Sequence, residues 1–218
     1  MKASIAVLFF TIFWLHLGFA QFALSSQIDS LKHELAIAKQ DTSRVLLLDE
    51  LCYVYMETKS DLAKIYGEKA LTLAKQVKFS RGEAVVLSTL GRLYRILGNY
   101  PKALNLEFRA LQIAEDYNYW EEKMDCLGRI GAIYMELQDY PKAKRYFKQV
   151  EALLEAPQAM QDDQSRLSCY SDLLWWAIRS KDLDANVKYL KKVKENFSAI
   201  KTPRELAYYN LQDRKSVV

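Results

Sequence analysis

Arg92 and Arg95 lie three positions apart in a segment with helical periodicity and are the side chains best suited to bind a charged ligand. Guanidinium groups at this spacing share one face of a helix, where they could bind carboxylates, although they could equally be solvated surface charges. Outside the first 20 residues the one histidine is His33, and Asp162 and Asp163 suit a helix cap better than a cation site. No phosphate-binding loop, nucleophile elbow or metal-ligand spacing occurs, so we expect no enzyme, no cofactor and no metal.

The elements that must position these arginines belong to a repeat. The same pattern of small, aromatic and proline residues occurs twice, 40 positions apart: Gly91, Tyr94, Tyr100, Pro101 and Ala103, then Gly131, Tyr134, Tyr140, Pro141 and Ala143. A period of this length is typical of stacked helical repeats. Ala63 and Ala70, which lie 40 positions before Ala103 and Ala110, indicate a degenerate earlier copy of the repeat.

Apolar periodicity predicts a lead helix within 21–40 and then paired helices. We expect an all-α fold, a right-handed superhelix of about four antiparallel helix hairpins at 41–79, 82–118, 121–156 and 163–197. Residues 198–218 would begin a further, incomplete repeat. Tyr208 and Tyr209 there leave an apolar face uncovered, which favours self-association through that end.

The positions that recur in both copies are expected to pack the helices together. Glycine within a helix is costly, so Gly91 and Gly131 indicate close contacts, and we expect them to face Ala103 and Ala143. The tyrosines should fill the space between hairpins. The alternative, an aromatic binding stripe, fits the spacing less well than packing does.

These residues resemble the tetratricopeptide repeat. The matching positions are Leu87, Leu90, Gly91, Tyr94, Gly98, Tyr100, Ala103, Ala110 and Leu111 in one unit, and Leu127, Ile130, Gly131, Tyr134, Tyr140, Ala143 and Phe147 in the next. Glu107 departs from the family by occupying a usual aromatic position, and the period is longer than the family's usual one. The resemblance, which covers about 41–197, implies an α-solenoid that binds a protein or peptide in its concave groove. It also extends to the exported sensory regions that precede histidine kinases or helix-turn-helix domains in some bacterial regulators.

In such a fold the first helix of each hairpin lines the groove. Helical phase predicts that the groove residues include Tyr55, Ser88, Arg92, Arg95 and Met135.

Composition narrows the choice of partner. The 31 basic residues exceed the 27 acidic ones only slightly and are interspersed with them, so we expect no nucleic-acid binding. The three cysteines, Cys52, Cys126 and Cys169, are widely spaced at apolar-periodic positions, where buried free thiols are expected more than a disulfide.

Residues 1–20 have the pattern of an export signal: Lys2, then a largely apolar run, then Gly18-Phe19-Ala20 as a small-x-small cleavage site. We therefore expect an exported protein of the periplasm or cell surface. In the alternative, residues 3–20 stay uncleaved as a membrane anchor. The leading functional hypothesis is a non-catalytic scaffold that binds a protein or peptide; the alternative is the truncated sensor region of a signal-transduction protein.

Overall fold

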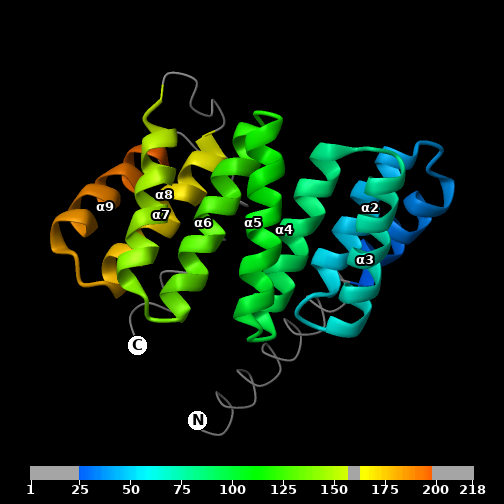
Figure 1. Ribbon diagram of the computed structural model, residues 1–218, viewed down its shortest axis with the longest axis horizontal. Helices are drawn as coiled ribbons and strands as arrows, with labels where there is room; N and C mark the ends of the chain where they lie inside the picture. Colours follow the sequence, from blue (N-terminus) through cyan, green and yellow to red (C-terminus); the bar gives the residue numbers. More distant parts are fainter. Residues whose placement is uncertain (1–24, 157–162, 198–218) are drawn as a thin grey trace, which may run out of the picture. The chain divides into compact units, whose positions relative to one another are not determined.

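The computed structural model describes residues 25–156 and 163–197, all of whose regular structure is α-helical (Figure 1). The predicted export signal at 1–20 and the predicted incomplete repeat at 198–218 lie outside these residues. None of the described helices is both long and apolar enough to cross a membrane.

The chain forms two units, the first ending at Tyr119. In it, a lead helix at 25–37 precedes α2 (Asp41–Tyr55), α3 (Ser60–Gln76), α4 (Ser80–Ile96) and α5 (Tyr100–Asp116). Helices α2 and α3 form one hairpin and α4 and α5 the next, and α4 also packs against both α2 and α3 (Figure 1).

The second unit begins at Trp120 and repeats this plan. Helix α6 (Trp120–Glu136) pairs with α7 (Tyr140–Leu154), and α8 (Asp163–Arg179) pairs with α9 (Leu183–Phe197). Helix α8 packs against both α6 and α7. The prediction of an all-α fold of consecutive helix hairpins is therefore confirmed.

The hairpin turns explain part of the repeated pattern. After α4 the chain turns through Gly98, at φ 72°, and Asn99 then accepts a hydrogen bond from the Lys102 backbone N–H at 3.2 Å. After α6 the corresponding residues are Gln138, at φ 59°, and Asp139, which caps α7 in the same way. A positive φ is free of strain for glycine and costs other residues energy, so the second turn is the less favourable of the two.

The first close contact between paired helices lies around Gly91, in the core of the α4–α5 hairpin. A Cβ atom at Gly91 would lie 2.7 Å from Glu107 Oε1 on α5, so only glycine leaves room for this side chain. Glu107 is completely buried, and its Oε2 accepts a 2.7 Å hydrogen bond from the Ser88 hydroxyl on α4. This bond satisfies a carboxyl oxygen that would be costly to bury without a donor.

The α6–α7 hairpin has an aromatic core at the same place. A Cβ atom at Gly131 would lie 3.0 Å from Cε1 and Cζ of Phe147, whose ring packs against Trp176 of α8 at a centroid distance of 5.8 Å. The prediction that the two glycines face Ala103 and Ala143 is wrong by one helical turn. The larger side chains four residues later need the space more than the alanines do.

The other repeat positions are buried alanines and tyrosines whose exposure differs, from Tyr94 at 8% to Tyr140 at 37%. The fully buried alanines are Ala63, Ala70, Ala103, Ala110 and Ala143. Two tyrosines have partners inside their own hairpin. Tyr134 stacks on Tyr146 at 5.6 Å, and Tyr94 accepts a hydrogen bond from Lys102 Nζ at 2.8 Å. Tyr100 is half-buried and Tyr140 is 37% exposed, so the expectation that all four rings fill the space between hairpins does not hold for Tyr140.

Candidate binding surface

The first helices of the two hairpins in the first unit form one surface, which we call the α2–α4 face. It is a stripe of α2 beside a stripe of α4, and its residues are Leu46, Asp49, Tyr53, Thr89, Arg92 and Ile96. The spacing within each stripe is three, four or seven residues, which keeps the side chains on one side of a helix.

Two contacts join the stripes and fix their side chains. The Thr89 hydroxyl donates a 3.1 Å hydrogen bond to Asp49 Oδ2. The Arg92 guanidinium carbon lies 4.9 Å from the centroid of the Tyr53 ring, a cation–π contact. Leu46 and Ile96, 47% and 43% exposed, are apolar positions toward opposite ends of the stripes.

Arg92 is the cation of this face. Its side chain is half-buried; Nε is itself buried and has no hydrogen-bond partner among the residues that the structure describes, so a ligand would meet the terminal NH2 groups. A guanidinium carries five N–H donors in a plane and binds carboxylates in a bidentate manner. Because the Tyr53 ring already limits its motion, less side-chain entropy is lost when Arg92 binds a ligand.

The structure places the five predicted groove residues differently. Tyr55, Ser88 and Met135 are buried, at 4%, 4% and 1% exposure, so they form part of the core and the prediction that they line an open groove is wrong. Arg92 lies on the α2–α4 face, and Arg95 is half-buried with partners of its own. Whether either arginine binds a ligand stays a prediction.

Sequence reasoning missed Tyr53, which is 46% exposed. Tyr53 and Tyr55 are two residues apart and so lie on different sides of α2. Tyr55 packs instead against Tyr66 of α3, with ring centroids 5.6 Å apart. The sequence does indicate which tyrosine is buried. Tyr55 shares a helix face with the apolar Leu48, Leu51 and Cys52, whereas Tyr53 lies one turn after the polar Asp49.

The equivalent surface of the second unit is more strongly ion-paired. Arg129 on α6 lies 3.4 Å from Asp125 Oδ2, one turn earlier. Burial, together with the nearby carboxylates of Asp125 and Asp172, raises the pKa of the Cys169 thiol on α8 to about 12. Such a thiol stays protonated near neutral pH and is a poor nucleophile.

Thiols and acidic groups elsewhere suggest no reactive centre. Cys52 and Cys126 are buried free thiols, and burial raises the pKa of Cys52 to about 12. Within the described ranges, no three His, Cys, Asp or Glu side chains gather where they could hold a metal ion.

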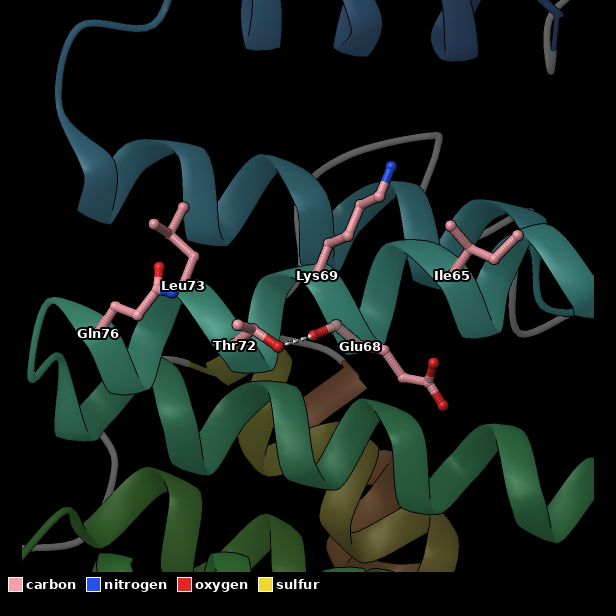
Figure 2. Close-up of a pocket in the computed structure, with 6 residues that line it drawn as sticks. All are labelled: Ile65, Glu68, Lys69, Thr72, Leu73 and Gln76. Atoms are coloured by element: carbon pink, nitrogen blue, oxygen red, sulfur yellow. Dashed lines mark hydrogen bonds between the residues drawn. The ribbon is translucent and has the colours of Figure 1, made fainter.

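A shallow hollow lies on the outer side of α3 (Figure 2). The described residues around it all come from this one helix: Ile65, Glu68, Lys69, Thr72, Leu73 and Gln76. The Thr72 hydroxyl donates to the Glu68 carbonyl oxygen at 2.8 Å and so turns back onto its own helix. A hollow with walls from a single helix encloses little of a ligand, which makes the α2–α4 face the stronger candidate.

Comparison with known proteins agrees with the repeat pattern. The sequence model of the tetratricopeptide repeat family matches residues 41–116, which span both hairpins of the first unit. A search of curated protein sequences gave no match.

Several solved structures share the fold. BtubC from P. vanneervenii superposes with a TM-score of 0.64 at 12% identity, over 84% of this chain and 78% of that one. TPR-like repeats from Podosopora anserina give 0.59 at 17% identity, over 81% and 88%. Aspartyl phosphate phosphatase F from Bacillus subtilis gives 0.69 at 15% identity, over 87% of this chain and 52% of that one. At these identities the likeness concerns the fold alone.

Proposed function

We propose that this chain, a member of the tetratricopeptide repeat family, is a non-catalytic scaffold that holds a peptide or protein segment on its α2–α4 face. The family's repeats mediate protein–protein interaction, and helices that are already folded bind with little ordering cost. The observation that carries the proposal is the half-buried Arg92 guanidinium, held 4.9 Å from the centroid of the exposed Tyr53 ring.

The chemistry of the face defines the segment that fits it. A carboxylate of the ligand would pair with the Arg92 guanidinium, and the Tyr53 ring would contact the ligand's apolar atoms. Leu46 and Ile96 would each accept an apolar side chain. The preferred segment is therefore an acidic residue with apolar residues on both sides. We place this scaffold outside the cytoplasm on the strength of the sequence of residues 1–20.

Selection from a displayed library of random peptides tests the proposal directly. We expect enriched peptides to carry the acidic residue between apolar ones and to bind Arg92→Ala about tenfold or more weakly than the unchanged chain. Arg109→Ala is the matched control, because Arg109 is an exposed arginine of α5 outside the face. Selected peptides without a carboxylate, or equal losses at Arg92 and Arg109, would overturn the assignment.

A further inference from the structure

An apolar stripe on the outer side of α9 has no role in the hairpin core. Leu183, Val187 and Leu190 are 76%, 71% and 42% exposed, at positions i, i+4 and i+7 of the helix. The opposite side of α9 carries Tyr189, which is buried and packs against Trp176. The helix is therefore apolar on both its core side and part of its solvent side.

Repeat packing does not require this stripe. When Ala185 of α9 is aligned with the buried Ala63 of α3 and Ala143 of α7, the corresponding positions are Asp61, Ile65 and Glu68 in α3, and Pro141, Arg145 and Lys148 in α7. These positions are exposed in both helices. The three apolar side chains of α9 are thus a property of this hairpin, and a cluster of exposed apolar residues commonly marks a contact surface.

Cations border the stripe. Lys194 continues it by one turn, and Lys191, whose side chain is 80% exposed, lies next to it. Helix α7 lies alongside, since Lys144 on α7 is 3.0 Å from Asp182, the residue before Leu183. The hydrogen bond from Lys144, with that from the Ala185 backbone N–H, holds the pKa of the Asp182 carboxyl below its usual value.

We propose that the outer side of α9 docks onto an anionic phospholipid surface, with Leu183, Val187 and Leu190 inserted among the acyl chains and the flanking lysines at the headgroups. Lysine suits such a boundary because its apolar stem can lie along the hydrocarbon while its ammonium group stays at the charged surface. The apolar run at residues 5–18, as export signal or as anchor, would bring the chain to a membrane.

Two other occupants fit the structure less well. Helix α4 packs on the α2–α3 hairpin, yet Ile65 of α3 remains 45% exposed beside Glu68 (Figure 2). A helix formed by residues 198–218 and stacked on α8 and α9 in the same way would therefore leave the α9 stripe uncovered. A second copy of the chain would bring Lys191 and Lys194 close to their own counterparts, and like charges repel.

The test is a polarity-sensitive fluorophore attached at Val187→Cys in the full chain, with Cys169→Ser so that the remaining native thiols are buried. Ile65→Cys is the matched control, because it is the corresponding exposed position on α3. We expect the emission at position 187 to rise about twofold or more with phosphatidylcholine vesicles containing about a quarter phosphatidylglycerol. Emission at position 65 should stay unchanged, even if residues 1–20 anchor the chain.

Two further measurements make the result specific. Lys191→Gln with Lys194→Gln should weaken the response at position 187, and added salt should do the same. Equal responses at positions 187 and 65, or equal responses to vesicles with and without phosphatidylglycerol, would overturn the proposal. No response at position 187 would also overturn it and would point to a protein with an acidic surface as the occupant.

Discussion

Replacing Gly131 by alanine should destabilise the α6–α7 hairpin, whereas the same replacement at Gly128 should stabilise it. The two glycines lie three residues apart on α6, so both changes gain the same helix propensity, about 1 kcal/mol. They differ in surroundings. A Cβ atom at Gly128 would meet nothing within 4 Å, while one at Gly131 would lie 3.0 Å from two atoms of the Phe147 ring.

The cost at Gly131 follows from the position of that ring. Carbon atoms in favourable contact are about 3.5–4.0 Å apart, so the ring would have to withdraw by about half an ångström. Phe147 is 1% exposed and packs against Trp176, so it has little room to do so. Overpacking of this kind costs about 1–3 kcal/mol. The free energy of unfolding should therefore be lower for Gly131→Ala than for Gly128→Ala by about the same amount.

Urea unfolding followed by far-UV circular dichroism measures this difference. Comparing the two variants with each other cancels the propensity gain and leaves the effect of the Phe147 contact. A Gly131→Ala variant as stable as Gly128→Ala would show that Phe147 can move away freely, and the explanation of the repeated glycine would then be wrong.

Three other outcomes are expected. Gly91→Ala should lower the free energy of unfolding in urea by up to about 2 kcal/mol, because its Cβ atom would lie 2.7 Å from Glu107 Oε1 and overpacking of about 1–3 kcal/mol outweighs a helix-propensity gain of about 1 kcal/mol; a gain in stability would show that Glu107 can leave its position. Cys169 in the folded chain should react with a thiol reagent far more slowly than in urea at about pH 8, because its pKa is raised to about 12; equal rates would contradict its burial. Lys144 lowers the pKa of Asp182, so this pair stabilises the fold above the usual pKa of an aspartate and the stabilisation is lost as pH falls through the lowered value. Asp182→Asn should therefore be less stable than the unchanged chain at neutral pH, by under about 1 kcal/mol, and equally stable in acid; a constant difference would disprove the linkage.

The hairpins could be predicted from the sequence because local chemistry determines them. Gly98 and Asn99 specify a turn, Pro101 suits the first turn of a helix, and the buried alanines recur at a fixed offset. Each of these signals acts within a few residues of the chain. The helix pairs and their order follow from such signals without knowledge of distant contacts.

The binding surface was harder to predict because it depends on which helix lies beside each residue. Ser88 is small and polar and was expected to face a groove, but it is buried and donates a hydrogen bond to Glu107, 19 residues later on α5. Tyr53 and Tyr55 have the same side chain, and Tyr55 is the buried one because its ring packs against Tyr66 of α3. Arg92 could be placed because its side of α4 is only partly covered, by Tyr53 of α2.

The difference between the cores of the two repeated hairpins helps each helix to pair with the correct helix of the same chain. Helices α4 and α6 are similar enough to compete for α5 while the chain folds. Helix α4 offers the Ser88 hydroxyl to Glu107, whereas the position 40 residues later in α6 is Gly128, which has no side-chain donor. Pairing α5 with α6 would bury the carboxyl without that hydrogen bond, at a cost of about 1–3 kcal/mol. One buried hydrogen bond thus favours the pairing of α5 with α4, the helix before it, over pairing with α6, the helix after it.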